Sequence, residues 1–280
     1  MSPDAIKFKL KSYSVKQGSN HQDTLTRFFH ERFLYRLSQS PYVDHFLLKG
    51  GTLAYAYGAE RSRHTRDIDL LLRKLQGDEK HIQSIFSKIA AIEIDDGVTF
   101  MADGVRISPI TKEGRYKGTR VKLIAMLGNV RQGMQIDIGV GDHVTPGPTQ
   151  IEFPTILSEL PEPVLLAYNL ETMLAEKFEA MISLGALNSR YKDFYDVYVF
   201  GAEAKPDLLE LAVRNTFTRR NTVIIAHPIV FSDGFYLDAQ RQTRWATFLR
   251  KNNLPLIDFT SVGIKILYWL QPIYERMKQR

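Results

Sequence analysis

The sequence predicts an α+β fold with two lobes, an N-terminal lobe built on a mixed or antiparallel sheet and a C-terminal lobe made mainly of helices. Between residues 67 and 142, short runs of alternating or β-branched residues are separated by glycine-rich turns, which is typical of strands. Beyond residue 164, apolar residues recur at helical spacing. Five prolines in the stretch 143–163 interrupt regular structure between the two patterns. We therefore expect one lobe in residues 1–155 and the other in residues 156–280.

The first lobe should contain both helices and strands. Apolar residues at helical spacing predict an amphipathic helix over 22–38 and a second helix near 80–91. A short helix is expected after Gly51, followed by a strand over 67–73. Further strands are predicted at 91–94, 99–102, 105–110, 119–127 and 134–142.

The second lobe should be helical almost throughout. A long helix is predicted over 164–185, ending at Gly185, and a second over 189–203. A third begins with proline and aspartate at residue 206, as helices often do. The last, over 257–278, contains Pro272, which can kink it.

Composition limits the class of protein. With 280 residues the chain can bury a sizeable core. No apolar run approaches the ~20 residues of a membrane helix, and the first residues lack the apolar block of a secretory signal. We therefore expect a cytoplasmic protein without a membrane partner. Cysteine is absent, so a bound metal would be a hard ion held by oxygen, with Mg²⁺ fitting best and Mn²⁺ as the alternative.

The charge balance favours a polyanionic partner. The formal net charge is +6 and the pI is about 9.3. Residues 1–155 hold 22 Lys and Arg against 17 Asp and Glu, whereas residues 156–280 hold 15 against 14. The excess lies largely in "ERSRHTR" (60–66) and "TKEGRYKGTRVK" (111–122). These segments are either contacts for a polyanion or ordinary solvated loops.

Two aspartates open the predicted strand at residue 67. Side chains alternate along a strand, so Asp67 and Asp69 face one way while Ile68 faces a core. Two carboxylates on one face repel each other unless a cation lies between them. The alternative is an ordinary exposed acid pair at a strand end. Upstream, the Gly50-Gly51-Thr52 turn either caps a short helix or offers unpaired N–H groups to an anion such as phosphate.

A third acid lies in "MQIDIGVGD", where Gln135, Asp137 and Gly139 share one face of a predicted strand. If this strand neighbours the strand of Asp67 and Asp69, three carboxylates converge. Such a cluster can hold magnesium ions that bridge the phosphates of a nucleotide and neutralise charge during in-line displacement.

Lys177 projects from an apolar stripe of the long helix, among neighbours such as Met173 and Met181. It either snorkels to water or crosses between the lobes to a triphosphate. Downstream, Asp193 and Asp196 share one helical face. They form surface pairs with Arg190 or Lys192, or Asp193 holds Lys177 in its working rotamer or helps to position a nucleophile. Asp196 is the weaker site candidate.

The stretches "LKGGTLAYAYGAERSRHTRDIDLLL", "MQIDIGVGD" and "EKFEAMISLGALNSRYKDFYDVY" together resemble the AbiEii/AbiGii nucleotidyltransferase toxin family. This family includes the MenT toxins and belongs to the DNA polymerase β-like superfamily. The resemblance spans roughly residues 46–200. It is carried by Gly-Gly-Thr, then Arg63-x-Thr65-x-Asp67-Ile-Asp69, then Lys177 and the block from Lys192 to Asp196.

The resemblance implies an N-terminal nucleotidyltransferase lobe and a helical lobe that contributes Lys177 and Asp193 to a site between them. The triphosphate would be bound by residues 50–52 with Arg63 and Thr65, and its phosphates by Lys177. Asp67 and Asp69 would bind the metal, with Asp137 as a third ligand that members of the family do not all share.

Known members of the family are toxins encoded beside an antitoxin, and some add nucleotides to the 3′ end of tRNA and block aminoacylation. The resemblance therefore implies an enzyme that transfers NMP from an NTP to an RNA 3′ end, most readily the tRNA acceptor stem. One alternative is a nucleotidyltransferase that modifies a small molecule or a protein. A second is a catalytically silent nucleotide-binding module that engages a partner protein.

Overall fold

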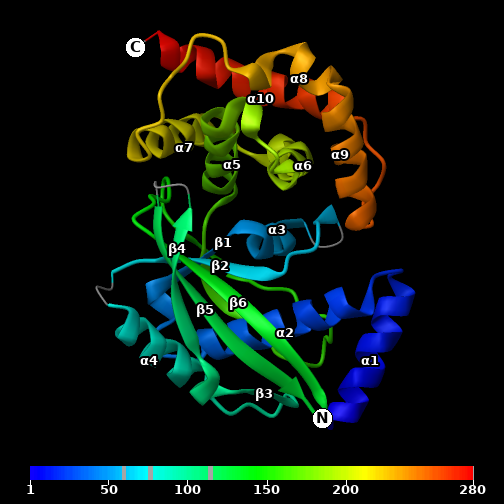
Figure 1. The fold of residues 1–280 in the computed structure, drawn as a ribbon. Helices are drawn as coiled ribbons and strands as arrows, with labels where there is room; N and C mark the ends of the chain where they lie inside the picture. The colour runs from blue at the N-terminus through cyan, green and yellow to red at the C-terminus, as the bar shows by residue number, and fades with distance from the viewer. Residues whose placement is uncertain (59–60, 75–77, 113–115, 280) are drawn as a thin grey trace. The chain divides into compact units, whose positions relative to one another are not determined.

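A computed structural model describes residues 1–58, 61–74, 78–112 and 116–279 of the chain. Two compact units make up the molecule. The first consists of Met1–Ala56, His64–Gly141 and Thr149–Ala167, and the second of Tyr57–Arg63, Asp142–Pro148 and Tyr168–Arg280. The sheet lies in the first unit, and the helices beyond residue 168 lie in the second (Figure 1). The α+β fold with a helical C-terminal part is thus confirmed.

The first unit is built on a mixed sheet whose strand order is β3-β5-β6-β2-β1-β8-β7, with β4 paired to β5. Two neighbouring pairs, β2 with β6 and β1 with β8, are parallel, and the other pairs are antiparallel. The strand bounds are β1 Phe46–Lys49, β2 Asp67–Leu72, β3 Val98–Phe100, β4 Arg106–Lys112, β5 Tyr116–Leu127, β6 Val130–Val140, β7 Thr149–Glu152 and β8 Val164–Ala167. The sheet is therefore mixed, which is one of the two kinds of sheet that the sequence predicts.

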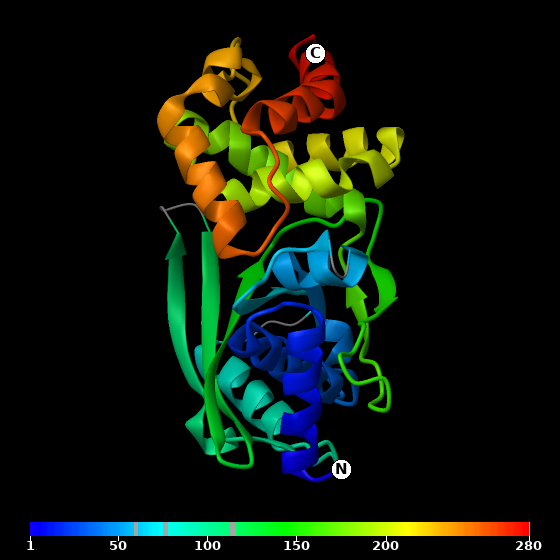
Figure 2. The same cartoon turned by 90° about the vertical axis from the view of Figure 1, so that its right-hand side faces the viewer.

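Helices α2 (His21–Ser38) and α4 (Glu79–Ala90) lie against the sheet, and α1 (Pro3–Lys16) packs on α2 (Figure 2). An aromatic cluster joins these layers. Phe33 stacks on Phe86 with ring centroids 6.0 Å apart, and Phe46 of β1 meets Phe86 edge-on at 5.3 Å. Aromatic pairs at these distances add to the stability gained by burying their surface.

Strand β2 is amphipathic, which fixes the direction of its two aspartates. Ile68 and Leu70 are buried in the core, with 0% and 1% of their surface exposed, whereas Asp67 and Asp69 are partly exposed. A shift of one residue in register would bury both carboxylates and expose both aliphatic side chains. The hydrophobic effect therefore holds the carboxylates on the outer face of the sheet.

The second unit packs its helices around an aromatic core. Phe178 of α5 contacts Phe217 of α7 and Tyr274 of α10, with ring centroids 5.5 and 6.2 Å apart. Asn169 caps α5 by accepting a hydrogen bond from the Thr172 backbone N–H. The helix bounds are α5 Leu170–Leu184, α6 Tyr191–Phe200, α7 Pro206–Arg219, α8 Asp233–Leu237, α9 Ala239–Lys251 and α10 Phe259–Lys278.

Some predicted elements are wrong or incomplete. Residues 91–94 form a turn and irregular structure rather than a strand. The long helix begins at Leu170, because Val164–Ala167 pairs as β8. The proline-rich connection contains β7. Helix α10 continues through Pro272. The sequence interpretation also did not predict α1, α8, α9 or β1.

Among the described helices, none combines the length and the apolar character that crossing a membrane would require.

Candidate functional site

One group of candidate site residues lies in the first unit, where β1 passes directly into α3 (Gly50–Gly58). Gly50 has a φ of 68°, a region that glycine enters without steric cost. Thr52 is buried, and its hydroxyl donates a hydrogen bond to the Asp67 carbonyl at 3.0 Å. Thr65 donates to the same carbonyl at 3.3 Å. The two threonine hydroxyls therefore fix the backbone that carries Asp67.

Four charged residues form a row across four adjacent strands on the same face of the sheet. Arg120 of β5 pairs in register with Asp137 of β6, Asp137 with Asp69 of β2, and Asp69 with Lys49 of β1. Cross-strand partners lie on one face. The conditional expectation that the strands of Asp69 and Asp137 are neighbours is confirmed, and two anionic residues lie between two cationic ones.

Asp137 is bound by Arg120 through two hydrogen bonds. The Nε and Nη2 atoms of Arg120 each lie 2.9 Å from a carboxylate oxygen of Asp137. The hydrogen bond with Asp137 raises the pKa of Arg120, and the charges of Asp137, Asp67 and Asp69 act in the same direction. The guanidinium thus lies within the electrostatic field of all three carboxylates.

The donors suit a divalent metal ion at Asp67 and Asp69 more directly than at Asp137. Asp67 and Asp69 offer carboxylate oxygens on one partly exposed face, the ligand type that Mg²⁺ prefers. In the described part of the chain, no three acidic or histidine side chains gather closely enough to enclose one ion. The predicted convergence of three carboxylates therefore takes the form of two partly exposed acids and a third that is paired with arginine.

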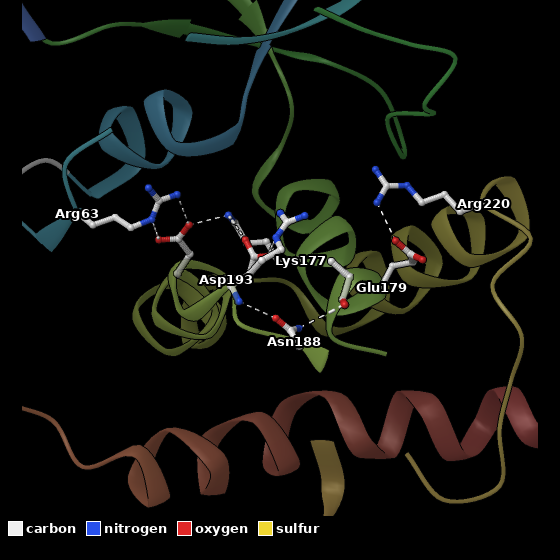
Figure 3. A network of polar contacts seen from close by, with 9 residues as sticks. Arg63, Lys177, Glu179, Asn188, Asp193 and Arg220 are labelled. Atoms are coloured by element: carbon white, nitrogen blue, oxygen red, sulfur yellow. Dashed lines mark hydrogen bonds and ion pairs between the residues drawn. The ribbon is translucent and has the colours of Figure 1, made fainter. Parts of the chain in front are cut away.

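A second cluster lies in the helical unit (Figure 3). Lys177 of α5 donates a hydrogen bond to Asp196 of α6 at 2.6 Å and lies 3.5 Å from Asp193. Only 6% of Lys177 is exposed, so of the two alternatives the one in which its amine snorkels to water does not hold. The ammonium ends instead on buried carboxylates of the same unit.

Arg63 supplies the second cation to Asp196. Its Nε and Nη2 atoms lie 3.2 and 3.1 Å from the two oxygens of Asp196. Burial alone would raise the pKa of Asp196, but Arg63 and Lys177 outweigh burial and lower that pKa. Arg190 pairs with Asp193, its Nε lying 2.7 Å from Oδ2. The cluster thus combines three cations with two buried carboxylates.

A family model for the nucleotidyl transferase AbiEii toxin of type IV toxin–antitoxin systems matches residues 32–262. The chain belongs to the AbiEii toxin family. The match includes the row of charges in the sheet and the lysine cluster of the helical unit. Membership makes this chain a nucleotidyltransferase of the toxin type, with an NTP as substrate and an antitoxin as partner.

Solved structures resemble this AbiEii family member in fold. MenT4, a nucleotidyltransferase toxin from Mycobacterium tuberculosis, is 15% identical, with 97% of this chain and 98% of that chain covered and a TM-score of 0.56. JHP933 from Helicobacter pylori is 12% identical over 89% of this chain and 90% of that chain, with a TM-score of 0.49. A search of curated protein sequences gives no match.

In this AbiEii family member the structure adds charged partners that the sequence interpretation did not assign to the site. Arg120 lies in the basic stretch noted at 111–122, but nothing in that stretch distinguishes Arg120 from its neighbours. Lys49 directly precedes the glycine pair. Lys49 enters the row through the pairing of β1 with β2. Arg120 enters it through the hairpin of β5 and β6, in which the two-residue turn fixes the register. The pairing of Arg63 with Asp196, by contrast, joins residues far apart in the chain, which a single sequence does not display.

Proposed function

We propose that this AbiEii family member transfers NMP from an NTP to the 3′ hydroxyl of an RNA, and that the acceptor end of tRNA is its substrate. The observation that carries the proposal is the position of Asp67 and Asp69. Both acids lie on the partly exposed face of β2, and the glycine start of α3 lies against Asp69. This arrangement supports a metal-dependent reaction of an anionic substrate at that face.

Asp67 and Asp69 would hold Mg²⁺, or Mn²⁺ in its place. When bound, such an ion neutralises charge on the phosphates and orients them for in-line displacement. The N–H groups at the start of α3, from Gly50 and Gly51, are suited to phosphate oxygens because a helix N-terminus carries partial positive charge. Thr52 and Thr65 support this arrangement by holding the backbone of Asp67.

In the helical unit, Lys177 would bind the phosphates of the nucleotide, and Asp193 would contribute to the same site. The bonds from Lys177 to Asp196 and from Asp196 to Arg63 would fix the lysine in one rotamer. Arg63 thus acts on the nucleotide through Asp196 and Lys177. A preorganised cation is worth more to a transition state than a mobile one, since it does not reorganise during the reaction.

The proposed reaction is a nucleotidyl transfer. The 3′ oxygen of the RNA forms a bond to the α-phosphorus, and the bond from that phosphorus to the oxygen bridging to the β-phosphorus breaks. Pyrophosphate leaves with that bridging oxygen, and the hydroxyl proton passes to solvent. The RNA gains one nucleotide, which in tRNA would block aminoacylation and so translation.

The net charge of +6 supports RNA over a small acceptor. A polyanion makes contacts with several Lys and Arg side chains, and each neutralised phosphate contributes to affinity at low salt. A small molecule would use few of them. The excess of positive charge also lies in the N-terminal half of the sequence, which carries Asp67 and Asp69.

The test uses the full chain with Mg²⁺, each of the four NTPs labelled at the α-phosphate, and total RNA, resolved on a denaturing gel. We expect one NTP to label a band of tRNA size, and EDTA to abolish the labelling. RNA whose 3′ ends have been oxidised with periodate is the matched control and should accept no label. Label on oxidised RNA, on a small molecule or on protein, or no label at all, would contradict the proposal.

A further inference from the structure

Arg120 ends the row of charges on the sheet, and the proposed reaction gives it no role. Two of the five N–H donors of a guanidinium are used in the hydrogen bonds from Nε and Nη2 to Asp137. The Arg120 side chain is 32% exposed, whereas that of Asp137 is 9% exposed. The arginine therefore faces solvent with donors to spare, and the aspartate lies beneath it.

The pairing with Asp137 also determines where the remaining N–H donors of Arg120 lie relative to Asp67 and Asp69. Asp137 is in register with Asp69 on the adjacent parallel strand, so Arg120 stands two strands from the proposed metal ligands on the same face. The charges of Asp67 and Asp69 both stabilise the guanidinium. A group that binds at Asp67 and Asp69 and extends along this row would meet Arg120.

We propose that Arg120 binds the triphosphate of the NTP, and that Asp137 is a positioning residue which orients Arg120 and is not a metal ligand. This inference rests on the proposed function for the position of the nucleotide. A guanidinium held on one edge by a carboxylate can present its other donors to phosphate oxygens in a fixed plane.

The two roles of Asp137 make different demands on its chemistry. As a metal ligand it would direct a carboxylate lone pair at the ion, and removing its charge would weaken metal binding. As a positioning residue it needs both oxygens on Arg120, as observed, and removing its charge would weaken phosphate binding. Lysine at position 120 would keep the charge but lose the planar two-point contact.

The first measurement uses inorganic tripolyphosphate as the probe, titrated calorimetrically into the full chain with Mg²⁺. We expect Arg120→Ala to weaken binding by about ten- to a hundredfold, the effect of losing hydrogen bonds to a charged group. Arg120→Lys and Asp137→Asn should each weaken it by a smaller factor. The double variant Arg120→Ala/Asp137→Asn should bind no more weakly than Arg120→Ala, because Asp137 acts through Arg120.

The second measurement follows free Mn²⁺ by electron paramagnetic resonance as the ion is titrated into the same variants. Asp137→Asn and Arg120→Ala should leave Mn²⁺ affinity within a few-fold of wild type or raise it, while Asp69→Asn should lower it strongly. Lost Mn²⁺ binding in Asp137→Asn with unchanged tripolyphosphate affinity would overturn the inference. So would unchanged tripolyphosphate affinity in a folded Arg120→Ala variant, as judged by thermal melting.

Steady-state kinetics separate this inference from the proposed function. In Arg120→Ala the KM for the NTP should rise while the KM for RNA stays the same. A rise only in the KM for RNA would place Arg120 on an RNA phosphate and overturn the inference. If the wild-type chain transfers no nucleotide to RNA yet binds tripolyphosphate through Arg120, the proposed function falls and the assignment of Arg120 stands.

Discussion

Gly50 and Asp69 fit together so closely that residue 50 has no room for a side chain: a Cβ atom on Gly50 would lie 2.0 Å from Oδ2 of Asp69. Gly50 also has a positive φ of 68°, which L residues with a side chain adopt at a cost of roughly 1–2 kcal/mol. The turn before α3 and the carboxylate of β2 therefore constrain each other.

Gly50→Ala is expected to displace the Asp69 carboxylate and to reduce nucleotide transfer by at least about a hundredfold, the scale seen when one catalytic group is misplaced. The melting temperature should also fall. The matched control is Gly133→Ala on β6, where an added Cβ meets nothing within 4 Å. Transfer by Gly50→Ala at the wild-type rate would show that the position of Asp69 is unimportant.

Asp67→Asn and Asp69→Asn are each expected to abolish transfer while the melting temperature stays within a few degrees of wild type. Both side chains are partly exposed and outside the core, so little packing is lost. Asp95→Asn serves as the control because the Asp95 side chain is 97% exposed. Single-turnover kinetics measure nucleotide transfer, and circular dichroism measures the melting temperature. Transfer retained in the Asp67→Asn/Asp69→Asn double variant would remove these residues from the site.

Lys177→Met should lower both stability and activity. The substitution keeps the apolar stem but removes the ammonium from buried Asp196 and Asp193, and breaking a buried ion pair costs on the order of 3 kcal/mol. Urea unfolding should show this loss, and transfer measured well below the melting transition should show a further loss of about a hundredfold. Lys251→Met, at an exposed position of α9, is the control. Full transfer by folded Lys177→Met would leave the lysine a structural role only.

The buried carboxyl of Glu31 makes stability depend on pH. Glu31 is completely buried, and burial raises its pKa from 4.5 to about 7, although Arg27 and the Ile156 N–H favour the charged form. The folded state thus holds this proton more tightly than the unfolded chain does. The resulting stability is fully present below pH 4.5 and is lost as the pH rises to about 7, by about 3 kcal/mol in all.

The measurement compares Glu31→Gln with wild type in urea at several pH values. The stability of the variant relative to wild type should rise by about 3 kcal/mol between pH 4.5 and pH 8, because glutamine does not ionise. Burial lowers the pKa of His30 to about 4. This shift has the opposite effect on stability, because its contribution is fully present above pH 6.5 and is lost as the pH falls. His30 is present in both proteins and cancels in the difference. A stability difference between Glu31→Gln and wild type that does not change with pH would show that the pKa of Glu31 is not raised in the folded state.

The parts of the fold that could be predicted are those whose pattern is local. Helix α2 and strand β2 differ from prediction by a residue at one end each. Strand β8 was missed because "VLLA" is a short apolar run that continues directly into a helical pattern, and periodicity does not separate such runs. Helix α9 was missed because only Trp245 and Leu249 are buried on an otherwise polar helix.

The candidate site shows the same division. The alternation around Ile68 was enough to place Asp67 and Asp69 on one face, because side-chain direction in a strand is a local property. The partner of Asp137 follows from the register of the β5–β6 hairpin and was overlooked, whereas the partner of Asp196 was not predictable. Arg63 reaches Asp196 from a segment 133 residues away in the chain. An ion pair of this kind depends on the folded topology and leaves no spacing rule in the sequence.

The division of the chain into units has a consequence for dissecting the molecule. The helical unit takes Tyr57–Arg63 and Asp142–Pro148 from within the N-terminal half of the sequence. These short segments supply Arg63 to Asp196 and Asp142 to Arg220, so a fragment starting at residue 168 would leave Asp196 and Arg220 without those counter-charges. The two units are thus interleaved along the gene product. A cut at one point would not yield two modules, and a domain exchange with another protein would have to graft three separate segments at once.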